Sequence, residues 1–114
     1  MHTAAVKSRQ TAAPFPGALA PKPSVLAIHG SASSGRQWRA LAQQLDRAAQ
    51  VRTPDLLGYG RAAGHGGDRL AALKAEMAQC AGKVHLVGHS LGGAVALRLA
   101  HARPDQVASV TLYD

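Results

Sequence analysis

Short apolar runs alternate along this chain with segments in which apolar residues recur every three or four positions. Runs rich in valine, leucine and isoleucine lie at 25–29, 51–53, 84–87 and 107–112, and this composition predicts four strands. Parallel strands joined by helices bury both faces of their sheet. The pattern therefore predicts an α/β fold, a three-layer sandwich in which helices cover both faces of a parallel sheet of about four strands.

Three helices are expected between these strands. The first runs from about Gly35 to Arg47, where apolar residues form one face. Asp68 can cap the second helix and Gly82 can end it, because a carboxylate accepts free N–H groups and glycine adopts the conformation of a helix end. The third helix is predicted over 92–103 and stops before Pro104.

The first 24 residues differ in composition from the rest. They contain four of the six prolines, three basic residues and no acidic residue. Prolines favour an extended chain, so we expect residues 1–24 to form a flexible leader rich in proline and alanine, ahead of one domain at 25–114. The apolar patch of this leader is short and interrupted by proline, which argues against a signal peptide; a transit peptide stays an alternative.

The net charge of +7 raises the question of nucleic-acid binding. The arginines are spread through the chain and never form a block, so we expect solvated helix faces and no nucleic-acid partner. No stretch approaches the ~20 apolar residues that cross a bilayer, so no membrane span is expected. Cys80 is the only cysteine, which predicts a buried structural thiol and a cytoplasmic protein.

The most informative segment is KVHLVGHSLGG at 83–93, where a predicted strand meets a predicted helix at Ser90. A sharp corner of this kind holds its serine in a strained backbone conformation with the hydroxyl projecting. It requires small residues two positions away on either side, which Gly88 and Gly92 supply. The positive end of the following helix faces a developing oxyanion. The segment therefore predicts a nucleophilic serine; the alternative is a plain glycine-rich turn.

Further motifs accompany this corner. They read VLAIHGSASSGRQW at 25–38, PDLLGYGRA at 54–62, VHLVGHSLGGAVALRLA at 84–100 and VASVTLYD at 107–114. With these segments the chain resembles the N-terminal half of an α/β-hydrolase-fold enzyme, in the family's order and at its usual spacing. Several linked motifs make the resemblance far more specific than the corner alone.

The resemblance implies a role for each matching position. Ser90 corresponds to the catalytic nucleophile. The main-chain N–H groups of Leu91 and Ser31 correspond to the two oxyanion donors, so the side chains of these two residues are not required. His29 is implied to brace the oxyanion loop, and Asp55 to stabilise the loop after its strand, both as structural residues. The remaining histidines show no spacing typical of a metal site.

A serine hydroxyl needs a base to take its proton and a carboxylate to orient that base. In the family these follow the nucleophile in the order acid, then histidine. After Ser90 the sequence offers only His101, inside the next helix, and the carboxylates of Asp105 and Asp114. Asp114 could occupy the place of the acid, and the histidine base is expected beyond the end of the sequence. We therefore expect a truncated fragment of a longer enzyme.

The resemblance implies a serine hydrolase that cleaves an ester or related acyl bond of a small molecule, in the class of carboxylic ester hydrolases, with no cofactor and no metal. A serine nucleophile argues against epoxide hydrolases and haloalkane dehalogenases, whose nucleophile is aspartate. Carboxylesterase, lipase, thioesterase and carbon–carbon bond hydrolase activities stay open. The alternative is a non-catalytic product that binds a ligand or partner, or that self-associates through the exposed edge of the strand at 107–112.

Overall fold

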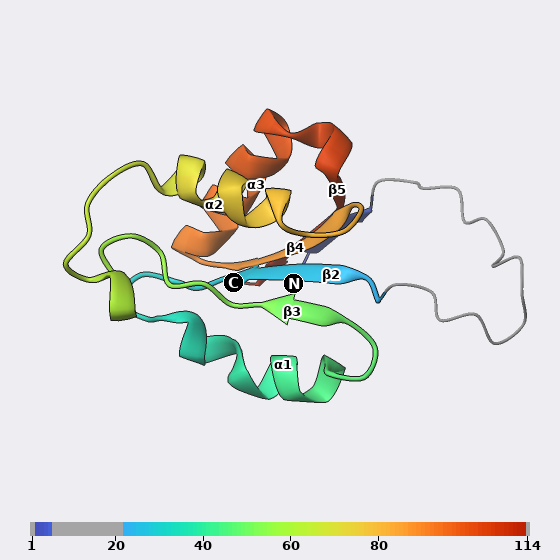
Figure 1. Ribbon diagram of the computed structural model, residues 1–114, viewed down its shortest axis with the longest axis horizontal. Coiled ribbons are helices and arrows are strands. Elements are labelled where there is room, and N and C mark those ends of the chain that lie inside the picture. Colours follow the sequence, from blue (N-terminus) through green and yellow to red (C-terminus); the bar gives the residue numbers. More distant parts are fainter. Residues whose placement is uncertain (1, 6–21, 114) are drawn as a thin grey trace, which may run out of the picture.

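The computed structural model describes residues 2–5 and 22–113, and four parallel strands form its centre (Figure 1). In chain order the strands are β2 (Ser24–Ile28), β3 (Gln50–Arg52), β4 (Val84–His89) and β5 (Val107–Tyr113). They lie in the spatial order β5-β4-β2-β3, with each neighbouring pair parallel. The predicted parallel sheet is confirmed.

Helices cover both faces of this sheet, as the sequence predicts. α1 (Arg39–Leu45) lies on one face, and α2 (Arg69–Ala78) and α3 (Leu91–Ala102) lie together on the other (Figure 1). Short 3₁₀ helices join these elements: η1 (Gly35–Trp38), η2 (Gly60–Ala62) and η3 (Pro104–Gln106). Within the described ranges no helix has the length and apolar character needed to cross a membrane.

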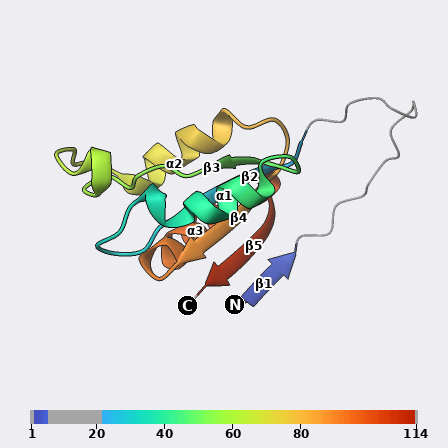
Figure 2. The same ribbon diagram turned by 90° about the horizontal axis from the view of Figure 1, so that it is seen from below.

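The N-terminal residues contribute a strand that the sequence pattern does not predict. β1 (His2–Ala5) runs antiparallel to β5, with His2 opposite Leu112 and Ala5 opposite Ser109 (Figure 2). The sheet is therefore five-stranded and mixed. The expectation that the outer edge of β5 is exposed is wrong, because the main chain of β1 pairs with that edge. Most of the leader expected over 1–24 lies outside the described residues.

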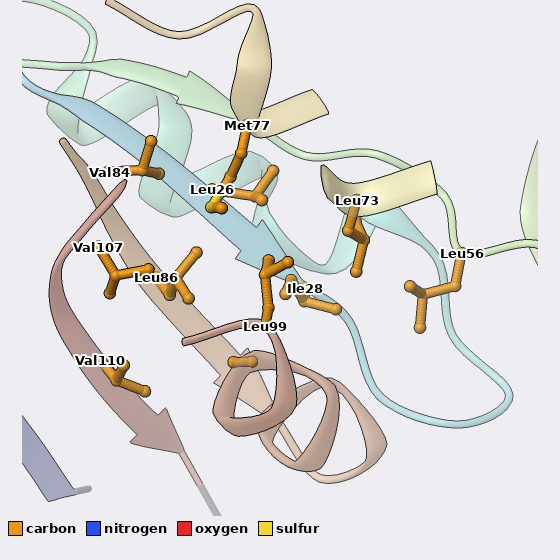
Figure 3. Close-up of a cluster of buried hydrophobic side chains, with 11 residues drawn as sticks. Leu26, Ile28, Leu56, Leu73, Met77, Val84, Leu86, Leu99, Val107 and Val110 are labelled. Carbon is orange, nitrogen blue, oxygen red and sulfur yellow. The ribbon is translucent and has the colours of Figure 1, made fainter. Parts of the chain in front are cut away.

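The hydrophobic core lies between the sheet and the pair α2 and α3 (Figure 3). Leu26 and Leu86 extend from the sheet toward this side, and both are fully buried. Leu99 on α3 and Leu73 on α2 close the core on the helix side. All five residues of β2 are buried, which fits a central parallel strand covered on both faces.

The helix starts follow the expected chemistry. The carboxylate of Asp68 accepts hydrogen bonds from the N–H groups of Leu70 and Ala71, at 2.9 and 3.3 Å, and so caps α2. Gly82 does not end α2 as expected: the helix stops at Ala78 with Gln79 as its C-cap, and Gly82 lies in the loop beyond, where its φ of +75° favours glycine. The first predicted helix begins as the 3₁₀ turn η1 before α1, and the Ser34 hydroxyl caps η1 by accepting a hydrogen bond from the N–H of Arg36.

The core packing leads to the first prediction. We expect Leu86→Ala to lower the free energy of unfolding by about 2–5 kcal/mol, because a buried leucine leaves a cavity that the rigid sheet cannot fill. Leu97→Ala is the matched control, since this leucine is 51% exposed and its loss should change stability by less than about 0.5 kcal/mol. Urea unfolding of the intact protein measures both, and equal effects would contradict the assigned core.

Candidate active site

Ser90 lies at the corner between β4 and α3, where the sequence places it. Its φ is +55° and its ψ is −117°, a conformation that residues with a side chain rarely adopt. Strain of this kind costs about 1–3 kcal/mol and persists only where the surroundings enforce it. The side chain is exposed, so the strained corner presents it to solvent.

Two glycines allow this corner to form. A Cβ atom on Gly92 would overlap the carbonyl oxygen of Ile28, and one on Gly88 would lie 2.6 Å from the Cα of Gly93. Both clashes are with main-chain atoms, which cannot rotate away. The first turn of α3 therefore lies directly against the ends of β2 and β4. The requirement for glycine two residues to either side of Ser90 is met here for a visible steric reason.

The main chain holds Ser90 from both sides. Its N–H donates to the carbonyl of Tyr113 at the end of β5, at 3.3 Å, and its carbonyl accepts from Gly93 at 2.9 Å and from Ala94 at 3.2 Å. Its hydroxyl forms no hydrogen bond with the residues in 2–5 and 22–113. The sequence pattern gives no sign of the contact with Tyr113, because it joins two strand ends far apart along the chain.

Ser31 lies in an exposed turn directly after β2. The turn is fixed on both sides of Gly30, whose N–H donates to Oε1 of Gln37 at 3.0 Å and whose carbonyl accepts from the N–H of Ser33 at 3.3 Å. Since β2 and β4 are neighbours, the turn and the start of α3 leave the same edge of the sheet. Within the described part of the chain, the N–H groups of Ser31 and Leu91 have no partner and stay free to donate.

His29 is fully buried below this turn, with both ring nitrogens engaged. Nε2 accepts from the N–H of Leu56 at 2.9 Å, so the proton is on Nδ1, which lies 2.8 Å from the carbonyl of Gly30 and donates to it. One side chain thus ties the turn after β2 to the loop after β3. This geometry fits the bracing role that the resemblance implies and leaves no nitrogen for proton transfer.

Two residues that the sequence does not single out support His29. The Tyr59 ring meets the imidazole edge to face at 5.4 Å between ring centres. The Arg69 guanidinium lies 5.1 Å above the Tyr59 ring, and its Nε donates to the carbonyl of Leu57 at 2.9 Å. Such contacts join α2 to the brace through an aromatic ring and a cation. An ordinary tyrosine and arginine in a loop carry no sequence signal for this arrangement.

Asp55 stabilises the loop after β3, in the structural role expected for it. Oδ1 accepts from the N–H of Gly35 at 2.7 Å, and Oδ2 accepts from the N–H of Arg61 at 2.8 Å. Because both hydrogen bonds favour the charged form, first that from Gly35 and then that from Arg61, the pKa of the carboxyl lies below its ordinary value of 3.8. Both carboxylate oxygens thus accept hydrogen bonds from main-chain N–H groups.

The other histidine, aspartate and cysteine side chains described in the structure form no hydrogen bond with the Ser90 hydroxyl. The His89 ring packs against Tyr113 at 5.3 Å, and the Nδ1 of His85 bonds the Ser109 hydroxyl at 2.7 Å. Further groups lie on exposed positions of the helices and loops: His65, His101 and Asp105.

Asp114 is outside the described residues. Cys80 is half-buried and bonds a helix carbonyl, and the described side chains include no cluster suited to a metal.

A strained serine at a strand-to-helix corner, on a parallel sheet covered on both faces, defines the class of α/β hydrolases. The sequence profile of the alpha/beta hydrolase family matches residues 25–114. The chain belongs to this family. The resemblance inferred from the motifs is confirmed over residues 25–114.

Curated relatives include lipases and esterases. Lipase LipV of Mycobacterium tuberculosis (strain ATCC 25618 / H37Rv) is 45% identical over 95 residues, covering 79% of this chain and 36% of the relative. Pimeloyl-[acyl-carrier protein] methyl ester esterase of Aliivibrio fischeri (strain MJ11) is 34% identical over 84 residues, covering 73% of this chain and 33% of the relative. The chain thus spans about a third of the length of these relatives.

Solved structures agree with this placement. The pyrethroid hydrolase PytH with BIF superposes with a TM-score of 0.71 at 31% identity, covering 79% of this chain and 39% of that one. An epoxide hydrolase from an endophytic Streptomyces superposes with a TM-score of 0.72 at 29% identity, covering 81% of this chain and 30% of that one. The described fold therefore corresponds to one part of longer hydrolase chains.

The close contact at Gly92 yields a second prediction. We expect Gly92→Ala to destabilise the intact protein by about 1–3 kcal/mol, because its Cβ would overlap main-chain atoms of β2. Gly93→Ala is the matched control, since its Cβ would meet atoms no nearer than 3.5 Å. That variant should be neutral or more stable by up to about 1 kcal/mol through helix propensity. Thermal and urea unfolding measure both; a stable Gly92→Ala protein would refute the contact.

The hydrogen bonds of Asp55 yield a third prediction. A lowered folded-state pKa means that this carboxylate stabilises the fold fully above its ordinary pKa of 3.8, and that the contribution is lost as pH falls through the lower value. Asp55→Asn should cost about 1–3 kcal/mol at neutral pH, since the amide keeps only one acceptor oxygen. Its stability should also depend less on pH in the acid range.

Urea unfolding at neutral pH and at a series of acid pH values tests this expectation. Asp105→Asn is the control, because this carboxylate is exposed on η3 and forms no hydrogen bond with the described residues. It should keep both the neutral-pH stability and the acid slope of the unchanged protein. An unaltered acid slope in Asp55→Asn would show that the carboxylate charge contributes nothing to folding.

Proposed function

We propose that this chain carries the nucleophile and the oxyanion donors of a serine hydrolase that cleaves carboxylic esters or closely related acyl bonds. The observation that carries the proposal is the backbone of Ser90, whose positive φ projects an exposed hydroxyl at the start of α3. The free N–H groups of Leu91 and Ser31 leave the same edge of the sheet and supply the donors for a developing oxyanion.

The reaction proceeds by acyl transfer. Ser90 Oγ attacks the ester carbonyl, a base removes the hydroxyl proton, and the alcohol leaves after accepting a proton. Water then attacks the acyl-enzyme, releases the acid and restores the serine. No described histidine bonds the Ser90 hydroxyl. The reaction therefore requires a base and an orienting acid that these histidine contacts do not supply.

The names of the relatives support an ester as the bond that is cleaved. The lipase matches 79% of this chain and the methyl ester esterase 73%. The likeness to an epoxide hydrolase supports the shared scaffold, but the chemistry of serine favours acyl transfer. Attack of a hydroxyl on an epoxide gives an ether, which water does not readily cleave, whereas attack on an ester gives an acyl-enzyme that water hydrolyses.

A fluorophosphonate probe tests the nucleophile in the intact full-length protein. We expect one labelled peptide, with the probe on Ser90, and loss of labelling in Ser90→Ala. Hydrolysis of p-nitrophenyl esters should fall by about 10⁴-fold or more in the same variant, since removal of a serine nucleophile leaves only binding and the oxyanion donors. Mass spectrometry locates the label.

Ser109→Ala is the matched control. This serine is half-buried on β5 and bonds His85, away from the corner, so its loss should leave labelling and turnover within about twofold of the unchanged protein. Labelling that persists in Ser90→Ala, or that falls on another serine, would overturn the assignment. Thermal unfolding of both variants establishes that they are folded.

A further inference from the structure

A cavity of about 410 Å³ is lined by the glycine-rich loop before α2, by the start of α2 and by the first turns of α3. Its apolar lining comes from three elements: Leu57 from the loop, Leu70 from α2, and Leu91 and Val95 from α3. Three glycines of the loop and four polar or charged side chains complete the lining: Gly58, Gly66, Gly67, His65, Asp68, Arg69 and Arg98. A larger cleft of about 1120 Å³ runs beside α1, but none of the proposed site residues lines it.

The wall of the smaller cavity on α3 starts at the residue that follows the proposed nucleophile in the chain. Leu91, the neighbour of Ser90, lines it, and Val95 and Arg98 follow at spacings of four and three along the same face of α3. Seven residues of helix correspond to about 10 Å of rise. The α3 wall of the cavity therefore begins with two apolar residues beside the reacting centre and ends, two turns later, at a guanidinium.

The charges of the lining are unequal. Arg98 is exposed and has no hydrogen bond or ion pair with the described residues. Arg69 is already engaged with Leu57 and the Tyr59 ring, and the single acid of the lining, Asp68, caps α2. His65 also lines the cavity and is exposed. The far end of the cavity thus carries an uncompensated positive charge.

We propose that this cavity binds the acyl part of the substrate, and that the substrate is an ester whose acyl chain ends in a carboxylate. The inference rests on the proposed function, because it places the ester carbonyl at the N–H of Leu91. The methylene chain lies against Leu91, Val95 and Leu70, and Arg98 receives the terminal carboxylate. An arginine fork binds a carboxylate through two parallel hydrogen bonds, which a methyl end cannot form.

The test compares two p-nitrophenyl esters with equal carbon chains in the intact full-length protein. The monoester of suberic acid ends in a carboxylate, and the ester of octanoic acid ends in a methyl group. We expect the suberate ester to have a kcat/KM about tenfold higher than the octanoate ester. This is the factor expected when only one of two substrates forms charge-assisted hydrogen bonds with the protein. Raised ionic strength should reduce this advantage, because salt screens an exposed charge.

Arg98→Gln should lower kcat/KM for the suberate ester about tenfold, mainly through KM, and leave the octanoate ester within about twofold. Arg103→Gln is the matched control, since this exposed arginine follows the same helix but lies outside the cavity lining. It should change neither substrate. Equal losses for both esters in Arg98→Gln, or a preference for octanoate in the unchanged protein, would overturn the proposed site.

Binding separates this inference from the proposed function. Ser90→Ala cannot form an acyl-enzyme, but it retains the cavity. Isothermal titration of this variant with suberate should therefore give tighter binding than with octanoate, and the difference should vanish when Arg98→Gln is added. Fluorophosphonate labelling of Ser90 without this difference overturns the cavity alone. Selective suberate binding, together with an unchanged protein whose Ser90 the probe does not label, overturns the proposed nucleophile alone.

Discussion

The structure depends on one close contact, between the first turn of α3 and the carboxyl end of β2. Gly92 lies so near the carbonyl oxygen of Ile28 that no side chain fits between them. Because the helix must begin there, the chain between β4 and α3 has to turn within one residue, and Ser90 takes the positive φ that this turn requires. The same contact places the start of α3 beside the turn that carries Ser31. One steric constraint thus fixes both the proposed nucleophile and the relation between its two proposed oxyanion donors.

The strain at Ser90 is held by interactions that surround it rather than by its own contacts. Its main-chain groups bond the end of β5 and the first turn of α3, and the buried leucines fix these elements to the sheet. His29 and Asp55 then tie the neighbouring loops together through hydrogen bonds to main-chain N–H groups. A strain of about 1–3 kcal/mol is small beside the burial of several leucines at about 1.5–3 kcal/mol each, so the core can sustain the corner.

Local chemistry allowed much of this arrangement to be predicted. The apolar periods gave the order of strands and helices, and Asp68 and the glycines at 88 and 92 act as their residue types require. The pairing of β1 with β5 was not predictable, because four residues carry no distinctive period and pair through their main chain. The support of His29 by Tyr59 and Arg69, and of Ser90 by Tyr113, joins residues that are distant in sequence. Such contacts follow from the fold and have no local signal.

The proposed function and the proposed cavity together place attack and recognition on adjacent parts of one helix. The N-terminal turn of α3 holds the proposed nucleophile and a free N–H group, while the next two turns line the cavity and end at Arg98. A strained backbone exposes the hydroxyl but does not remove its proton, so reaction still requires a base. Substrate binding requires no base. Because α3 is rigid and packed against the sheet, a chain bound along it would be aligned with the corner before proton transfer begins, which reduces the entropic part of the barrier.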